Sequence, residues 1–188
     1  MMEDDCICAY RVHPESGKTE YIGKVDDIIV DGEKQLSCEP YAFELDDGTL
    51  VCHIRVQTPK GETKLFTTYQ TISSDGGRTW STPERILPEF GGAPAHIMLH
   101  SSGTLISVYG FRGSPIKTKP YGIKAMFSRD GGRTWDTDHI IYTNEVSHDL
   151  GYPSTVELSD GTLLTVFYAK EKEDSPAVIM QQKWRFED

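Results

Sequence analysis

Two nearly identical octapeptides decide the fold of this sequence: SSDGGRTW at residues 73–80 and SRDGGRTW at residues 128–135. Seven of their eight letters agree, and the two copies lie 55 residues apart. A weaker copy, HPESGKTEY, occupies residues 13–21. Because the same loop returns at a nearly fixed interval, the chain is predicted to be built from a repeated structural unit.

A second phrase recurs with almost the same period. Gly-Thr-Leu follows a polar turn at Gly48, Gly103 and Gly161, with spacings of 55 and 58 residues. Apolar and β-branched runs flank each turn, which is the pattern of a β-hairpin. A third run leads into the octapeptide, and a short fourth run follows it. Each unit of about 55 residues is therefore predicted to hold four antiparallel strands.

Four-stranded units of this length, without helical periodicity, are typical of β-propeller blades, so we predict an all-β propeller. The 188 residues hold about three and a half units, whereas propellers usually close with about four to eight. We expect the last strands of one blade at 1–35, blades at 36–90 and 91–145, and an incomplete blade at 146–188. Either the chain is part of a longer propeller, or two copies complete one ring as a homodimer.

Composition excludes several partners. A formal charge of −10 would repel a nucleic-acid backbone or an anionic membrane. No apolar run approaches the ~18 residues of a membrane span, and the acidic start MMEDDCICAY lacks the features of a signal peptide. We expect a soluble protein, cytoplasmic as written, or secreted or periplasmic if a signal lies upstream.

The four cysteines match no zinc spacing. No metal or cofactor is therefore predicted, and the thiols are expected to be reduced and buried in strands.

The octapeptide is predicted to be scaffolding. Its Asp can accept hydrogen bonds from backbone N–H groups of the turn, Gly-Gly permits positive φ, and Trp can pack beneath. A calcium loop would need more carboxylates, and a phosphate loop would need a helix behind it. The loop therefore closes a hairpin at the end of the strands that lies away from any shared pocket.

The register of the repeat predicts which residues share the opposite end of the strands. That end holds the start of each first strand and the end of each second strand. The positions nine before and seven after each turn glycine are held by Glu39, Pro94 and Tyr152, and by Arg55, Gly110 and Tyr168. We expect Glu39, Arg55 and Tyr152 to face one another there, beside the central channel.

The pattern Ser-x-Asp-x-Gly-x-Thr-Trp resembles the Asp-box, or BNR repeat, of the sialidase (neuraminidase) superfamily. The resemblance covers almost the whole chain and implies the C-terminal half of a six-bladed propeller. It implies an exo-acting, retaining glycoside hydrolase whose partner is a glycan with a terminal acidic sugar. The family's reaction uses a tyrosine nucleophile and needs no metal.

The resemblance also implies roles for individual residues. Tyr152 in GYPSTVELSDG is similar to the tyrosine nucleophile, and Glu39 in LSCEPYAFELDDGTL is similar to the glutamate that activates it. Arg55 resembles one arginine of the triad that binds the substrate carboxylate, and Arg112 in YGFR is the candidate for another. His96 and Asp149 are further candidate pocket residues, which would contact the substrate.

Two parts of the family's catalytic set have no match in this sequence: the Arg-Ile-Pro segment with a triad arginine, and the aspartate acid/base. A chain without the acid is expected to be a poor glycosidase by itself. Three functions therefore stay open. They are the C-terminal part of a sialidase-like domain, a partial propeller that binds glycans or proteins without cleavage, and a glycosidase of the same fold acting on a non-sialic sugar.

Overall fold

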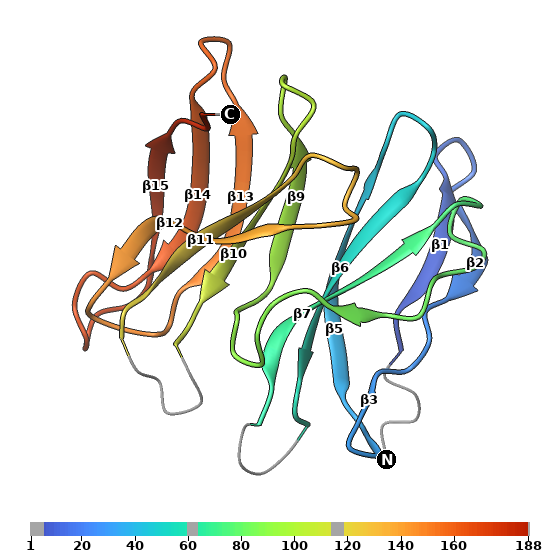
Figure 1. Cartoon of the computed structure of the whole chain (residues 1–188), viewed down its shortest axis with the longest axis horizontal. Helices are drawn as coiled ribbons and strands as arrows, with labels where there is room; N and C mark the ends of the chain where they lie inside the picture. Colours follow the sequence, from blue (N-terminus) through green and yellow to red (C-terminus); the bar gives the residue numbers. More distant parts are fainter. Residues whose placement is uncertain (1–5, 60–63, 114–118, 188) are drawn as a thin grey trace.

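The computed structural model describes residues 6–59, 64–113 and 119–187, and the regular structure of these residues is all β. Three antiparallel sheets follow one another along the chain and lie side by side, from the N-terminal to the C-terminal side of the molecule (Figure 1). Within the described part of the chain no helix is long and apolar enough to cross a membrane.

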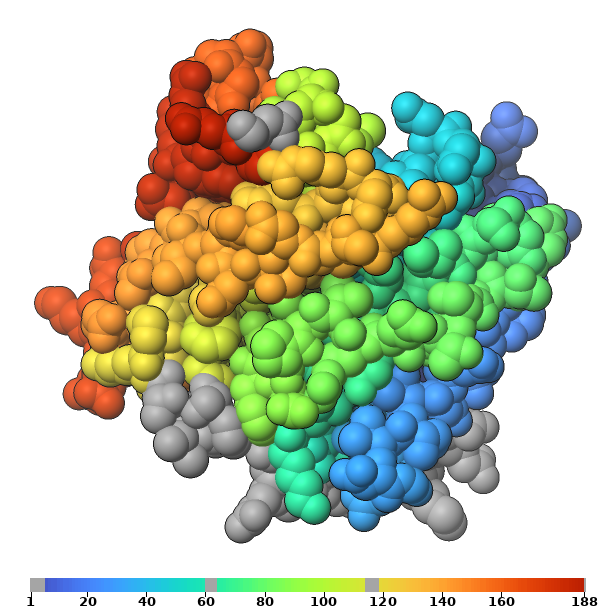
Figure 2. Space-filling model, viewed as in Figure 1, coloured from blue at the N-terminus to red at the C-terminus, as the bar shows by residue number. Residues whose placement is uncertain are grey.

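Each sheet is a simple meander in chain order. The first contains β5 (Leu36–Glu44), β6 (Leu50–Gln57), β7 (Phe66–Ser73) and β8 (Glu84–Arg85). The second contains β9 (Ala95–Leu99), β10 (Leu105–Phe111), β11 (Tyr121–Ser128) and β12 (Asp136–Asn144), of which β12 lies at the surface in Figure 2. The third contains β13 (Gly151–Glu157), β14 (Leu163–Ala169) and β15 (Val178–Trp184). The predicted four-strand unit is therefore present twice, followed by a three-stranded sheet.

The N-terminal part forms two hairpins, one predicted and one not. β1 (Cys8–His13) pairs with β2 (Lys18–Lys24) across the weak octapeptide copy, as expected. β3 (Ile29–Val30) and β4 (Glu33–Lys34) form a small additional hairpin. Its turn residues, Asp31 and Gly32, both have positive φ (53° and 79°), as a two-residue hairpin turn requires. Its strands are two residues long, too short to show an alternating pattern.

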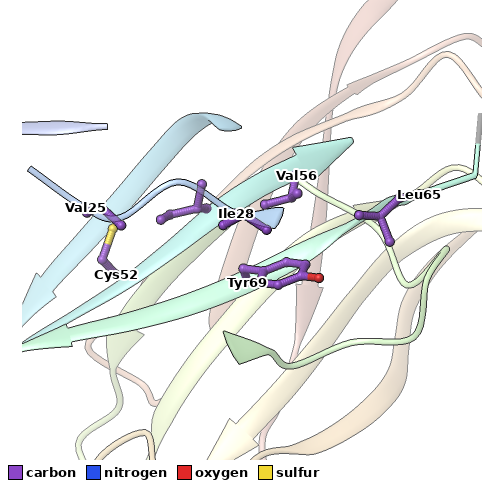
Figure 3. Close-up of a cluster of buried hydrophobic side chains, with 7 residues drawn as sticks. Val25, Ile28, Cys52, Val56, Leu65 and Tyr69 are labelled. Carbon is purple, nitrogen blue, oxygen red and sulfur yellow. The ribbon is translucent and has the colours of Figure 1, made fainter. Parts of the chain in front are cut away.

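The central strands β6 and β10 are largely buried because other parts of the chain pack against both of their faces. Beside β6, Val25 and Ile28 of the segment after β2 pack against Ile54, Val56 and other apolar residues of the first sheet (Figure 3). Such fully buried aliphatic side chains each stabilise the fold by about 1.5–3 kcal/mol. The core therefore lies between the sheets.

None of the four cysteines, all of which lie in the described residues, forms a disulfide. Cys52 on β6 is buried, and burial raises its pKa to about 12. Cys6, Cys8 and Cys38 are only partly buried, and Cys6 precedes β1. The expectation of buried thiols in strands is therefore correct for Cys52. Cys8 and Cys38 lie in strands but are only partly buried, and Cys6 lies outside a strand.

The octapeptide loops form the hydrogen bonds that their sequence predicts. In the first loop, Arg78 N–H and Thr79 N–H donate to Asp75 Oδ1 (3.0 and 2.9 Å), and the Thr79 hydroxyl donates to Oδ2 (2.7 Å). The second loop repeats these bonds around Asp130. Donors that favour the charged form lower the pKa of each Asp to about 2. The loops are therefore self-closed turns.

We expect these carboxylates to stabilise the fold only above mildly acidic pH. Their pKa is about 2 in the folded chain and 3.8 ordinarily, so their contribution is complete above about pH 4 and is lost as the pH falls toward 2. The variant Asp75→Asn/Asp130→Asn should be less stable than wild type at neutral pH and lose less stability across this range. Urea unfolding at several pH values measures both. An unchanged acid profile in the variant would contradict the assignment.

A buried polar network joins the first two sheets. His53 on β6 is fully buried, with Nδ1 3.0 Å from Ser107 Oγ on β10 and Nε2 3.1 Å from Gln70 Oε1. Gln70 Nε2 donates to Gly132 O (2.8 Å), and Trp135 Nε1 donates to Gln70 Oε1 (2.8 Å). The second octapeptide is thereby attached to the preceding sheet. Burial lowers the pKa of His53 to about 4.

Candidate active site

Glu39 and Tyr152 occupy matching irregularities in the first strands of two sheets. The register of β5 against β6 shifts around Glu39, and that of β13 against β14 shifts around Tyr152. Both residues have a φ of 50°, in the left-handed region that few non-glycine residues adopt. Each precedes a proline. Backbone of this kind is concentrated at functional sites, where the surrounding structure holds it in place.

The structure brings together the three residues that the repeat register predicts to meet. The Tyr152 hydroxyl donates to Glu39 Oε1 across 113 positions of sequence. Arg55 Nη1 donates to both carboxylate oxygens of Glu39, at 3.0 and 2.9 Å. The Tyr152 residue is 50% exposed, whereas the side chains of Glu39 and Arg55 are 31% and 15% exposed. The phenol of Tyr152 is thus accessible to solvent, and its hydroxyl contacts a carboxylate that Arg55 also binds.

The hydrogen bond to Glu39 raises the pKa of Tyr152, because the carboxylate stabilises the phenolic proton. Burial and the negative charge of Glu39 act in the same direction, while the positive charges of Arg55 and Arg112 lower it. Tyr152 is therefore neutral near neutral pH, with its proton directed at a base.

Arg55 uses most of its donors within the protein. A guanidinium has five N–H groups. Nη1 is directed at Glu39, and Nε and Nη2 both donate to Gln57 Oε1, at 3.1 and 2.6 Å. The guanidinium also lies over the Phe66 ring, 5.0 Å from its centroid. In this arrangement Arg55 orients Glu39 and is not set to bind a second carboxylate bidentately.

Arg112 follows β10 of the second sheet, and its side chain forms hydrogen bonds with residues in and next to the third sheet. Its Nε donates to Leu150 O (2.8 Å), and its Nη2 donates to the Tyr168 hydroxyl (3.0 Å). Tyr168 donates in turn to Asp149 Oδ1 (3.1 Å), and Lys170 Nζ lies 3.8 Å from Asp149 Oδ2. The candidate Asp149 therefore reaches Arg112 through Tyr168. Neither Tyr168 nor Gln57 is singled out by sequence reasoning, although Tyr168 holds the repeat position equivalent to Arg55.

A cavity of about 220 Å³ opens beside the Tyr152–Glu39 pair. His96 lines it, with its ring 4.6 Å from that of Tyr41, and its Nδ1 accepts from Thr155 N–H at 3.4 Å. Burial lowers the pKa of His96, so the imidazole is neutral. The lining residues are Glu39, Pro40, Tyr41, Pro94, Ala95, His96, Tyr152 and Pro153.

The cavity offers one carboxylate and one imidazole as charged or metal-ligating groups. Among the residues that the structure describes, no three His, Cys, Asp or Glu side chains gather in a geometry that could hold a metal ion.

Four-stranded meanders that repeat along the chain, with an Asp-box after the third strand of each of the first two sheets, are typical of a β-propeller protein of the BNR class. Residues 23–183 match the family described as the BNR repeat-like domain, and the chain belongs to this family. The predicted resemblance is thereby confirmed. A sequence comparison with characterised proteins finds no match.

Solved structures share the fold at low sequence identity. A protein of unknown function from Dyadobacter fermentans DSM 18053 has a TM-score of 0.69 and 23% identity, over 95% of this chain and 49% of that chain. The Hadza microbial sialidase Hz136 has a TM-score of 0.63 and 18% identity, over 87% and 35%. The Penicillium chrysogenum alpha-L-arabinanase complexed with arabinobiose has 0.65 and 13%, over 98% and 56%.

These likenesses confirm the predicted all-β propeller fold. The chain spans 35% to 56% of the length of these three proteins. It corresponds to part of a propeller, as the count of repeats predicts.

Proposed function

We propose that this chain is the C-terminal part of the catalytic domain of a sialidase-like glycoside hydrolase, exo-acting and retaining, with Tyr152 as nucleophile. The observation that carries the proposal is the hydrogen bond from the Tyr152 hydroxyl to Glu39, formed by residues in matching bulges of two sheets. Membership of the BNR repeat-like family and the fold shared with a sialidase support it.

The proposed reaction has two steps. In the first, the Tyr152 oxygen forms a bond to the anomeric carbon, its proton passes to Glu39, and the glycosidic bond breaks. The leaving oxygen takes a proton from an acid that no residue of this chain is assigned to supply. In the second, water attacks the anomeric carbon and the bond to Tyr152 breaks. Glu39 returns its proton to Tyr152, the proton of water passes to the group that acted as the acid, and configuration is retained. A neutral phenol suits an anomeric centre bearing a carboxylate, because an anionic nucleophile would be repelled by that carboxylate.

A fluorinated sialosyl fluoride tests the proposal without requiring the acid, because fluoride departs without protonation. We expect one covalent sialosyl adduct on the chain by intact-mass measurement, located on the peptide that contains Tyr152. If the protein binds N-acetylneuraminic acid but forms no adduct, the chain is a binding module and the hydrolase proposal is wrong. An adduct on another residue would exclude Tyr152 as nucleophile.

A glycosidase acting on a neutral sugar is the second candidate, and the state of Arg55 favours it. Because Glu39 and Gln57 accept most of its hydrogen bonds, fewer donors remain for an acidic substrate. The arabinanase of the same fold is described in complex with arabinobiose, which carries no carboxylate. Parallel assays with an aryl sialoside and an aryl arabinofuranoside distinguish the two. Turnover of the arabinofuranoside alone would select the neutral sugar.

We further propose that a second copy of the chain, or the rest of a longer propeller, covers the outer face of the third sheet. Val156, Val166 and Ile179 on that face are 54%, 39% and 79% exposed. Uncovered apolar sheet surface favours association. For the isolated chain we expect light scattering to give about twice the 21.1 kDa monomer mass.

The variant Val166→Asp provides the control for this association. It places a charge on the same exposed face and should shift the chain toward monomer. A wild-type chain that remains monomeric at every concentration tested would contradict pairing between copies.

A further inference from the structure

Arg112 is held by three groups that come from different parts of the fold. Leu150 O and the Tyr168 hydroxyl accept from Nε and Nη2, the two nitrogens on one edge of the guanidinium. The ring of Phe66, on β7 of the first sheet, lies against the guanidinium, with its centroid 5.7 Å from Cζ. Since one edge and one face are engaged, the orientation of the guanidinium plane is determined by the protein.

We infer that Tyr168 is a positioning residue that orients Arg112 to bind a carboxylate end-on, through its Nη1 and Nη2 groups. This inference rests on the proposed function and deepens it. Guanidinium–carboxylate pairs bind best as two parallel hydrogen bonds, which requires a fixed plane. Arg55 cannot serve equally, because Nη1 is directed at Glu39 and Nη2 at Gln57.

Asp149 determines the direction of the hydrogen bonds through Tyr168. Asp149 Oδ1 accepts from the Tyr168 hydroxyl at 3.1 Å, so the lone pairs of the phenolic oxygen face Arg112 Nη2 at 3.0 Å. A hydroxyl that donates to a carboxylate becomes a better acceptor, which strengthens the bond from Arg112. The two hydrogen bonds therefore have the same direction, from Arg112 to Tyr168 and from Tyr168 to Asp149.

Tyr168 also connects anion binding with the proposed nucleophile. Its ring lies 5.9 Å from that of Tyr152, centroid to centroid. The two phenols have different partners, since Tyr152 donates to Glu39 and Tyr168 to Asp149. Tyr168 therefore contacts the guanidinium through its hydroxyl, and its ring lies beside that of the proposed nucleophile.

The variant Tyr168→Phe removes the hydroxyl and keeps the ring. Two properties are measured: the NMR signal of the Arg112 Nε–H group in the ligand-free protein, assigned with Arg112→Lys, and the affinity for N-acetylneuraminic acid. We expect the Nε–H signal to shift and exchange faster, and the affinity to fall about tenfold, as loss of one charge-assisted hydrogen bond predicts. Asp149→Asn should change both in the same direction, with a smaller effect.

Tyr142→Phe is the matched control, because Tyr142 is also partly buried and its hydroxyl donates to Met180 Sδ, at 3.7 Å, far from Arg112 in the sequence. It should change neither property. An Arg112 signal and an affinity that are both unchanged in Tyr168→Phe would overturn the inference. If wild type does not bind the acid but the Arg112 signal responds as expected, the positioning role stands and the sialidase proposal fails.

Discussion

Replacement of Tyr152 by phenylalanine is expected to abolish adduct formation with a fluorinated sialosyl fluoride and to lower turnover of an activated aryl sialoside by about a thousandfold or more. The substitution removes the single oxygen that would attack and the hydrogen bond to Glu39. Because Tyr152 is 50% exposed, the folded state should persist with little change in stability. Intact-mass kinetics and fluorescence assays measure the two losses.

The variant Glu39→Gln distinguishes attack by Tyr152 from the activation of Tyr152 by Glu39. Glutamine can accept the hydrogen bond from Tyr152 but cannot take its proton, so labelling should be slowed and not abolished. The same substitution removes the ion pair with Arg55. Labelling of Tyr152→Phe at the wild-type rate would show that another group is the nucleophile, and the proposed mechanism would have to be abandoned.

The second large effect is expected in the acid stability of the fold. His53 has an ordinary pKa of 6.5 and a folded pKa of about 4, because burial disfavours its charged form. Between these values only the unfolded chain takes up the proton. Stability is therefore complete above about pH 6.5 and falls as the pH approaches 4, with a total loss of about 3 kcal/mol from this residue.

The variant His53→Gln measures that contribution. Glutamine can hydrogen-bond to Ser107 and Gln70 but does not titrate, so stability should fall less steeply between these pH values. The variant should be less stable than wild type near neutral pH, because the ring contact with Trp135 (4.9 Å between centroids) is lost. Burial also lowers the pKa of His96. Because the substitution leaves His96 in place, the difference between the two profiles of stability against pH reports the contribution of His53. Parallel pH profiles for the two proteins would contradict the assignment.

Most of the fold could be predicted because repetition makes the sequence its own comparison. The spacing of the turn glycines places Glu39 and Tyr152 in the same register, and the structure shows their side chains in contact. The β3–β4 hairpin was missed because two-residue strands carry no periodicity, although Asp31-Gly32 is a typical hairpin turn.

Contacts between different sheets could not be predicted in the same way. His53 and Ser107 are 54 positions apart, and Gln70 and Trp135 are 65 apart. Each is an ordinary strand or loop residue when considered alone. The commitment of Arg55 to Gln57 also depends on side-chain orientation, which a repeat register does not specify. Sequence therefore predicted that Glu39, Arg55 and Tyr152 meet, whereas the hydrogen-bond partners of Arg55 and Arg112 required three-dimensional geometry.

The paired bulges have a consequence for how such a protein can change over evolutionary time. A bulged residue stands outside the regular pairing of its strand, so its side chain can be exchanged without disturbing the ladder. The equivalent position in the repeat holds Glu39 and Tyr152 in the bulged first strands of the first and third sheets, and Pro94 just before the first strand of the second sheet. Reactivity can therefore be acquired, lost or altered blade by blade, while the turns and core that maintain the architecture remain under separate selection.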